Sequence, residues 1–365
     1  MSRRPVPRPI GPVRSTGPTR YSDGPPRWVP WSVAIRSALY GHGGFFHRPE
    51  GPAGHFRTSV HASPLFATAV VALLESVDAS LGRPDRLDLV DVGAGRGELL
   101  IAVLAQLTDL AEPPAYPGLA DRVHLHGVEL ADRPEGLPEA ISWSAELPEG
   151  VVGLLVANEW LDSVPVDVVE TGPDGVHRVL VDPADGAESP GGPAGLRDAG
   201  WLAQWWPLDG APEGARAEVG FPRDAAWADA VRSLERGLAV MIDYGHLRAG
   251  RVAGDYETGT LRGYRDGRLV PPVPDGTCDL TAHVAVDACA DAGLRAGAVD
   301  SRLLRQSEAL RQLGITPASS TQMDTERLEH ASQVAELTAP DGLGAFWWLL
   351  QSVGAPIPSL AGRSV

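Results

Sequence analysis

Residues 87–100, which read LDLVDVGAGRGELL, constrain the fold of this chain more than any other stretch. The mostly apolar residues 87–92 predict a buried parallel strand, and glycines at 93, 95 and 97 precede a helical pattern. A turn at the carboxyl end of a strand needs residues that tolerate unusual φ angles and let a ligand approach the backbone. The following helix presents free backbone amides. The stretch therefore predicts a cofactor-binding strand, glycine turn and helix.

The spacing of the glycines separates two cofactor classes. Dinucleotide enzymes favour G-x-G-x-x-G, in which a pyrophosphate lies at the helix N-terminus. Here the spacing is G-x-G-x-G, with Asp91 two residues before the first glycine and Glu98 directly after the last. Acidic side chains suit a cationic sulfonium better than a pyrophosphate. The pattern resembles motif I of the class I S-adenosylmethionine methyltransferases; an ordinary strand-to-helix turn is the alternative.

Length, charge and cysteine content limit the classes of protein. The 365 residues accommodate one large domain with insertions or two domains sharing an interface. The net charge of −16 disfavours a nucleic-acid partner, and no apolar stretch is long enough to predict a membrane span. Cys278 and Cys289 are too few for a disulfide framework and favour a reducing cytoplasm.

The distribution of elements predicts four segments. Residues 1–26 form a disordered tail rich in Pro and Arg, and residues 27–82 form an N-terminal helical and lid segment. The segment includes helices at 28–39 and from Pro64 onward, the latter N-capped by Ser63. Residues 83–300 form the cofactor-binding core with an insertion at about 164–220, and residues 301–365 supply C-terminal helices and a closing element.

The core alternates strands and helices, which predicts an α/β fold with a doubly wound, Rossmann-like sheet. We expect a hairpin inserted beside this sheet, a mobile loop after it, and helical additions on the substrate side. The expected strands are 87–92, 122–130, 140–143, 151–157, 237–243 and one near 294–299. The hairpin is expected at 164–170 with 175–181, and the loop at 182–199. The later helices are expected at 221–235, 287–292, 301–313 and 324–337, and a buried element at 345–350.

Residues at the ends of the first strands are the candidates for holding the cofactor. Glu129 closes the second strand, where this architecture places an acid on the ribose hydroxyls, and the loop 109–121 absorbs its long spacing from Gly97. Trp143 could stack on adenine or belong to the core. The predicted cofactor set is Asp91, Gly93, Ala94, Gly95, Gly97, Glu129, Leu130, Trp143 and Asn158.

The fourth strand leads into ANEWLDSVP, residues 157–165, which predicts the catalytic loop. Methyl transfer is an in-line displacement, so the enzyme mainly aligns the nucleophile and keeps it electron-rich. Glu159 is the first candidate for orienting a guanidinium through a bidentate contact, with an N-cap or solvated acid as the alternative. Asp162 lies nearby, and His283 is either a base, a hinge for these acids or a structural histidine. His124 and His126 lack a third ligand at suitable spacing, so no metal is expected.

A glycine-rich, aromatic segment before Ser63 predicts a docked lid over the site, although a flexible surface connection remains the alternative. Its phenylalanines are Phe45, Phe46 and Phe56. The predicted substrate-binding residues are Phe56, Thr58, Ser59 and His61 from this segment and Tyr244 from the end of a later strand.

Eight stretches follow the motif order of one family. They are GHFRTSVHASPLF, LVDVGAGRGELL, GVEL, ISW, ANEWLDSVPV, IDYG, GTLRGYR and DLTAHV. The chain thereby resembles the MidA-like S-adenosylmethionine-dependent methyltransferases over residues 36–350. The resemblance implies a class I methyltransferase fold and S-adenosylmethionine as cofactor, with S-adenosylhomocysteine as product. The mitochondrial member is a protein arginine methyltransferase acting in complex I assembly. Glu159 and Trp160 resemble the first acid of the double-glutamate loop in arginine methyltransferases.

The lid departs from the family pattern G-D-F-x-T-S-P-E-I-S. This chain has His55 in place of the acid, and Val60 and His61 in place of the proline and glutamate. The acceptor is therefore open: a protein arginine, a peptide or a small metabolite. A nicotinamide oxidoreductase and a non-catalytic assembly or binding protein are the competing hypotheses. The expected enzyme is cytoplasmic, binds neither nucleic acid nor membrane, and leaves a homodimer open.

Overall fold

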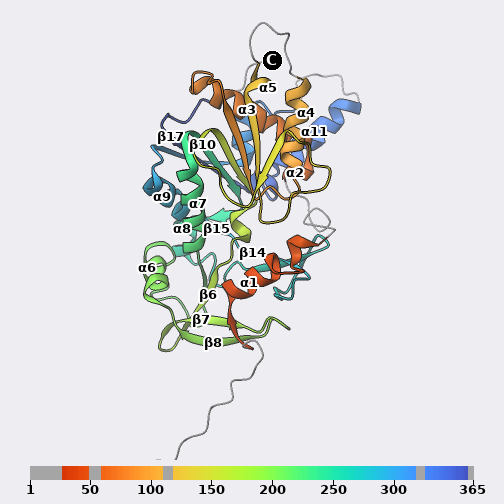
Figure 1. Ribbon diagram of the computed structural model, residues 1–365. Helices are drawn as coiled ribbons and strands as arrows, with labels where there is room; N and C mark the ends of the chain where they lie inside the picture. The colour runs from red at the N-terminus through yellow and green to blue at the C-terminus, as the bar shows by residue number, and fades with distance from the viewer. Residues whose placement is uncertain (1–26, 49–58, 110–117, 318–324, 361–365) are drawn as a thin grey trace, which may run out of the picture.

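The computed structural model describes residues 27–48, 59–109, 118–317 and 325–360 (Figure 1). The strands are β1 Val29–Pro30, β2 Leu87–Val92, β3 Val123–Val128, β4 Ile141–Ser144, β5 Val151–Asn158, β6 Asp167–Gly172, β7 Gly175–Val181, β8 Glu188–Pro193, β9 Arg216–Val219, β10 Leu234–Asp243, β11 Gly245–His246, β12 Arg262–Arg265, β13 Arg268–Val270, β14 Asp279–Thr281, β15 Val284–Ala285, β16 Asp300–Arg305 and β17 Trp347–Val353. The helices are α1 Trp31–Tyr40, α2 Ser59–Ala62, α3 Pro64–Ser80, α4 Glu98–Asp109, α5 Leu119–Arg122, α6 Leu196–Trp205, α7 Phe221–Ser233, α8 Arg248–Ala253, α9 Val286–Ala296, α10 Gln306–Gln312 and α11 Thr325–Thr338, with 3-10 turns η1 Phe45–His47, η3 Leu161–Ser163 and η4 Leu343–Ala345.

The main sheet has seven strands in the order β16-β17-β10-β5-β2-β3-β4. β10, β5, β2, β3 and β4 are parallel, whereas β17 pairs antiparallel with both β10 and β16. β2 is buried along its whole length, as its apolar sequence predicts for a central parallel strand. The chain runs outward from β2 in one direction and from β5 in the other, which opens a crevice at the carboxyl ends of these two strands.

Helices cover both faces of this sheet, which confirms the α/β prediction. Figure 1 shows α3, α4 and α11 on one side and α7 and α9 on the other. The first side buries Phe66, Leu74 and Leu100 against the sheet, and the second buries Trp227 and Val286. The predicted N-cap of α3 is confirmed, since the Ser63 hydroxyl accepts the backbone N–H of Leu65 at 3.0 Å.

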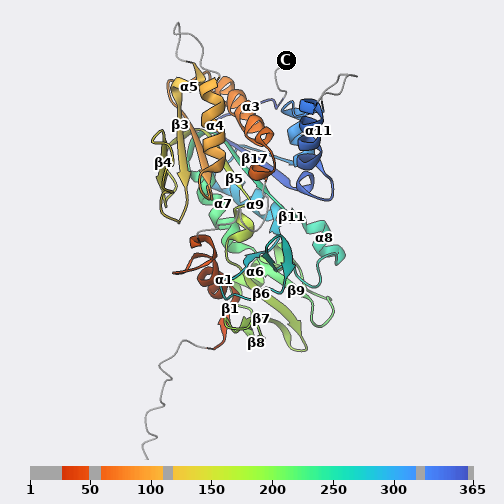
Figure 2. The ribbon, with the colours of Figure 1, turned by 90° about the vertical axis from the view of Figure 1, so that its right-hand side faces the viewer.

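A second lobe lies beyond the carboxyl ends of the main strands, below the main sheet in Figure 1 and in the turned view of Figure 2. The predicted hairpin is confirmed as β6 and β7, but it belongs to a separate sheet, β1-β7-β6-β9, with β8 paired to β7. The expected mobile loop at 182–199 is wrong, because β8 and the start of α6 occupy it. α1 from the N-terminal segment also packs here, through Trp31 and Leu39.

The C-terminal prediction needs two corrections. The strand expected near 294–299 is wrong, because α9 continues to Ala296 and the strand is β16, which begins at Asp300. The helix expected at 301–313 is β16 followed by α10. Pairing with the buried strand β17 overrides the helical spacing of this stretch. The helix at 324–337 and the buried element at 345–350 are confirmed as α11 and β17.

Within the described parts of the chain, no helix is both long and apolar enough to cross a membrane. The division into four segments stays a prediction, and the tail at 1–26 lies outside the described residues.

Candidate functional site

One cavity of about 1150 Å³ lies between the main sheet and the second lobe. Its upper wall consists of the loops that follow β2, β3, β4 and β5, at the crevice where the strand order reverses. Its opposite wall comes from α1, η1, β12 and β14, and the segment around η4 closes one side. Segments far apart in sequence thus build one site at the carboxyl ends of parallel strands.

The glycine turn after β2 forms the floor of one half of the cavity. Gly93, Gly95 and Gly97 have φ angles of 74°, 57° and 83°, in the left-handed region that favours glycine. A Cβ on Gly93 would lie 2.9 Å from the indole of Trp160, and one on Gly97 would lie 2.7 Å from the side chain of Leu137. Backbone conformation and close packing therefore both require glycine here.

Acidic side chains surround this glycine turn. The carboxylate of Glu129 accepts the N–H of Gly95 at 3.2 Å through Oε2 and that of Leu130 at 2.7 Å through Oε1. Burial raises the pKa of Glu129, against the effect of these hydrogen bonds. Burial, with repulsion from Glu98 and Glu129, also raises the pKa of Asp91 to about 7. A cation bound in this half would therefore be stabilised by nearby carboxylates.

These residues fit the expected sulfonium cofactor. Most of the predicted set lines the cavity: Asp91, Gly93, Ala94, Gly95, Glu129, Leu130 and Asn158. The Oδ1 atom of Asn158 is buried without a hydrogen-bond partner among the described residues, so it could accept an N–H group of a ligand. When bound, S-adenosylmethionine supplies an electrophilic methyl group. The glycine turn and Glu129 would hold its nucleoside end.

Trp143 and Gly97 do not line the cavity. The indole N–H of Trp143 donates to the carbonyl oxygen of Ala131 at 3.1 Å, and its ring covers the backbone of Gly127 and Gly97. The tryptophan thus packs behind the turn, while residues after it in sequence reach the cavity instead: Ala145, Glu146 and Leu147. The sequence offered no signal for these three.

The loop after β5 brings two acids into the other half of the cavity. Glu159 has a φ of 51°, which is strained for a residue with a side chain, and its N–H donates to the carbonyl oxygen of Ile242 at 2.8 Å. Its Oε1 accepts the N–H of Ser59 at 3.1 Å and the amide of Asn158 at 3.3 Å. Burial and the neighbouring Asp162 raise the pKa of Glu159 to about 8.

Asp162 lies in η3, next to Glu159. Its Oδ2 accepts the hydroxyl of Tyr244 at 2.5 Å, and its Oδ1 accepts the hydroxyl of Ser163 at 3.1 Å. Burial raises the pKa of this carboxyl, although both hydroxyls and the charge of Arg223 oppose the rise. Asp162, predicted as a catalytic residue, and Tyr244, predicted as a substrate-binding residue, both line the cavity, and these roles stay predictions.

His283 lines the cavity and packs edge-to-face on Tyr244, with ring centroids 5.3 Å apart. Burial lowers its pKa to about 4, with Arg223 and Arg262 adding to the effect, so the imidazole is neutral at pH 7. Its backbone N–H donates to the hydroxyl of Thr260 at 3.0 Å. The predicted role as a base or hinge stays a prediction.

The lid segment reaches both halves of the site through α2. His61 lines the cavity, and its Nε2 lies 3.5 Å from Oε1 of Glu98, the first residue of α4 after the glycine turn. Ser59 is buried beside the cavity and contacts Glu159 through its backbone N–H. Phe46 lines the cavity, whereas the predicted residues Phe56 and Thr58, together with His55, lie outside the described residues.

Sequence reasoning missed the part of the lining that the second lobe contributes. These residues are Arg36, Tyr40, Tyr264, Asp279 and Thr281; Phe346, which follows η4 and precedes β17, was missed as well. Asp279 is almost fully buried, and burial together with Asp162 raises its pKa well above the ordinary value. The unperiodic, polar character of residues 259–286 was the available signal for Tyr264, Asp279 and Thr281; Tyr40 and Phe346 carried none.

The predicted lack of a metal site concerned His124 and His126. His126 Nε2 contacts Asp88 Oδ1 at 3.2 Å. Over the described ranges, no group of three or more His, Cys, Asp and Glu side chains is arranged to hold a metal ion.

Comparisons with known proteins agree on a family. Residues 66–302 match the family model described as "Putative S-adenosyl-L-methionine-dependent methyltransferase". A COG1565 superfamily member from Burkholderia thailandensis, bound to S-adenosyl-homocysteine, is 25% identical, with a TM-score of 0.73 over 92% of this chain and 91% of that chain. A native structure of a COG1565 superfamily protein from the same organism is 26% identical, with a TM-score of 0.72 over 92% and 90%.

Curated relatives carry the name protein arginine methyltransferase NDUFAF7, mitochondrial. The protein of Xenopus tropicalis is 27% identical over 278 residues, and the homolog of Drosophila melanogaster is 27% identical over 276 residues. These alignments cover 65% and 64% of this chain. The chain spans only 60% and 59% of the length of these relatives.

The family predicted from the motif order is thus confirmed, rather than the alternative of a nicotinamide oxidoreductase. The cofactor is S-adenosyl-L-methionine, and the reaction requires a methyl acceptor. The family model covers well over half of the chain, and the strand order and glycine turn are those of a class I methyltransferase. The chain therefore belongs to this family of S-adenosyl-L-methionine-dependent methyltransferases.

Proposed function

We propose that this enzyme transfers the methyl group to a guanidinium nitrogen of an arginine in a protein, and that Glu159 orients the arginine. The observation that carries the proposal is the half-buried carboxylate of Glu159 on the cavity wall, at the end of β5, with its raised pKa. Among the described residues, no arginine or histidine forms an ion pair with it. A cationic acceptor would supply the missing counter-charge.

A guanidinium acceptor must be oriented and must lose a proton, and the acidic side chains of the site can serve both purposes. A carboxylate accepts two N–H groups of a planar guanidinium and thereby aims one nitrogen while the positive charge gathers on the others. The nitrogen that forms the new bond to carbon must also release a proton. Asp162, which already accepts the hydroxyl of Tyr244, is the nearby group that could receive it. The names of the curated relatives support the same acceptor.

The test is the Glu159→Gln variant, assayed with radiolabelled S-adenosylmethionine and a protein extract from cells that lack this enzyme. We expect transfer to fall about 100-fold or more, because the amide neither balances nor orients the cation. Affinity for S-adenosylhomocysteine, measured by calorimetry, should change less than about threefold. Glu149→Gln, an exposed acid in the loop before β5, is the matched control and should retain activity.

Mass spectrometry of the same extract identifies the acceptor through an increment of about 14 Da, the mass of one added CH₂ unit. Arginine-bearing peptides should carry this increment. An increment confined to small metabolites or to other residue types would contradict the proposal. Binding of S-adenosylhomocysteine without transfer to any component would instead favour a non-catalytic assembly protein. The cytoplasmic location and a homodimer stay predictions.

A further inference from the structure

Arg223, in the first turn of α7, connects two loops of the cavity through one guanidinium group. Nη2 donates to the carbonyl oxygen of Asp162 at 2.5 Å, and Nε donates to that of Val164 at 3.2 Å. Nη1 donates to the carbonyl oxygens of Ala282 and His283, at 2.9 and 3.0 Å. The first two carbonyls belong to the loop after β5, and the last two follow β14 in the second lobe.

Burying an arginine at this place costs more free energy than burying a neutral side chain would. Arg223 is only 2% exposed, and no carboxylate among the described residues forms an ion pair with it. Burying a charge without a counter-ion costs several kcal/mol unless it is well hydrogen-bonded. A planar guanidinium with five N–H groups can bind carbonyls of two separate loops at once, whereas the ammonium group of lysine offers a single point. The planar arrangement of these N–H groups therefore explains why arginine occupies this position.

The short turn η3 is held from both ends. At its start, Oδ2 of Asp243 accepts the N–H groups of Leu161 and Asp162, at 3.0 and 3.1 Å. At its end, Arg223 binds the carbonyl oxygen of Asp162. The N–H of Ala282 donates to the same carbonyl oxygen at 3.2 Å, so the two loops meet where the guanidinium lies. The backbone that carries the Asp162 carboxylate has little freedom to move.

We propose that Arg223 is a positioning residue for methyl transfer. It holds the loop of Asp162 and the loop of His283 in fixed positions across the acceptor half of the cavity, which is the half that contains Glu159 and Asp162. Among the described residues its side chain donates to these four carbonyl oxygens and to no group of the glycine turn or of Glu129, so it acts apart from the cofactor half of the cavity, which contains that turn and Glu129. The inference rests on the proposed function only for the kind of acceptor. The hydrogen bonds from Arg223 to the two loops do not depend on which group accepts the methyl.

The charge of Arg223 supports the same role. It lowers the pKa of the Asp162 carboxyl, against the effect of burial, and lowers the pKa of His283. The other groups that face His283 are Arg262 and the rings of Tyr244, His246 and Tyr256. Arg223 therefore favours the ionised form of Asp162 and the neutral form of His283 together.

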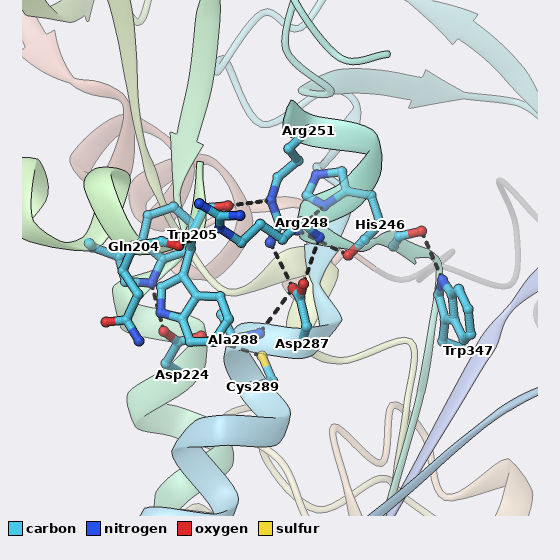
Figure 3. A network of polar contacts seen from close by, with 12 residues as sticks. Gln204, Trp205, Asp224, His246, Arg248, Arg251, Asp287, Ala288, Cys289 and Trp347 are labelled. Carbon is cyan, nitrogen blue, oxygen red and sulfur yellow. Dashed lines mark hydrogen bonds and ion pairs between the residues drawn. The ribbon is translucent and has the colours of Figure 1, made fainter. Parts of the chain in front are cut away.

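Arg251 offers a matched control (Figure 3). It is also buried, and it connects three elements, α6, β11 and α9: Nε donates to the carbonyl oxygen of Trp205 at 2.8 Å, Nη1 to Nδ1 of His246 at 2.9 Å, and Nη2 to Oδ1 of Asp287 at 2.7 Å. None of these partners lines the cavity. Its loss should weaken the fold without moving the loops of Asp162 and His283.

The test compares Arg223→Met, Arg223→Lys and Arg251→Met in the full chain. Three measurements are made: S-adenosylhomocysteine affinity by calorimetry, amide hydrogen exchange, and steady-state transfer to the acceptor found through the 14 Da increment. For Arg223→Met we expect exchange at 160–165 and 281–284 to speed up about tenfold, as for a lost hydrogen bond. kcat should fall on the order of 30–100-fold, as for a misplaced group, while cofactor affinity and KM change less than about threefold.

Arg223→Lys should recover part of kcat, because it restores one charged donor. Arg251→Met should lower the melting temperature but keep kcat within about threefold and leave exchange at 160–165 unchanged. Equal losses of kcat in Arg223→Met and Arg251→Met, or unchanged exchange at both loops, would overturn the proposal. If Arg223→Met fails to fold, Arg223→Lys carries the comparison. If the wild type binds S-adenosylhomocysteine but transfers no methyl group, the proposed function fails, and the exchange data still decide whether Arg223 holds the loops.

Discussion

At the scale of single residues, burial governs the acids of the cavity. Glu159 and Asp91 have pKa values raised to about 8 and about 7, and the pKa of Asp279 is raised well above its ordinary value. Desolvation is the largest cause in each case, and neighbouring carboxylates reinforce it. The site thus holds acids that ionise readily only when a cation arrives.

The pH dependence of transfer follows from Glu159. Because the proposed role of Glu159 requires an ionised carboxylate to bind a guanidinium, kcat/KM should rise with pH and level off above about 8, the raised pKa of Glu159. A profile of kcat/KM measured from pH 5.5 to pH 9.5 checks this. In Glu159→Gln the rise of kcat/KM with pH should be absent. A wild-type profile already flat at pH 6 would contradict the assignment.

The same raised pKa predicts that protein stability falls as the pH rises, whereas kcat/KM increases. The folded state binds the proton of Glu159 more tightly than the unfolded state does, so this residue's contribution is complete below pH 4.5 and is lost as pH rises to about 8. Relative to Glu159→Gln, the free energy of unfolding of the wild type should therefore decline over this window by a few kcal/mol, an order of magnitude set by ~1.4 kcal/mol per pKa unit. Urea unfolding at pH 5 and pH 8.5 measures the difference.

At the scale of elements, the packing of β4 on β3 supports the cofactor half from behind. Trp143 in β4 lies over Gly127 in β3, and a Cβ on Gly127 would come within 2.4 Å of its ring. The strand can approach the indole only because glycine has no side chain. This contact also backs the turn at Gly97, since the same ring lies 3.6 Å from where its Cβ would be.

Gly127→Ala should therefore destabilise the protein by about 1–3 kcal/mol, because the ring must leave its place. Gly200→Ala is the matched control: Gly200 is exposed in α6, and a Cβ there would meet nothing within 4 Å. That substitution should stabilise by about 0.4–1 kcal/mol, since alanine favours the helix. Denaturant unfolding followed by tryptophan fluorescence measures both; equal effects would refute the packing argument.

At the scale of the whole molecule, the cavity lies between two lobes of a strongly acidic protein. The net charge is −16, and carboxylates lie in both halves of the cavity. A basic acceptor should thus be attracted over a distance, and salt should screen that attraction. This long-range field acts on encounter with the acceptor rather than on the step in which the methyl group moves.

For a basic acceptor protein we expect kcat/KM to fall about three- to tenfold between 50 and 500 mM NaCl, because the Debye length shortens from ~14 Å to ~4 Å. kcat should change little, since the bound acceptor is shielded from salt. Steady-state kinetics at five salt concentrations, with potassium acetate as a second salt, tests this. A kcat/KM that rises with salt would show that the acceptor is not recognised through its positive charge.

Much of the cofactor half could be predicted from the sequence by itself. The glycines at 93, 95 and 97 and Glu129 each follow a strand whose apolar run is visible locally, and parallel strands end at one edge. The loop with Glu159, in the other half, also follows such a strand. The same local reading misplaced Trp143, because whether a tryptophan faces a ligand or a neighbouring glycine depends on the partner strand.

In the acceptor half, only the tertiary structure decided which side chains of the second lobe lie opposite Glu159 and Asp162. Tyr40 lies in α1, the helix directly after β1, which pairs with β7 more than 130 residues later in the chain, whereas Tyr264 and Asp279 lie in β12 and β14 of a separate sheet. No local pattern encodes these pairings. β16 is a strand because β17 offers it a partner, despite its helical spacing. The sequence therefore determined which cofactor is bound, through short-range geometry; long-range pairing determined which side chains line the other half of the cavity and which carbonyl oxygens Arg223 binds.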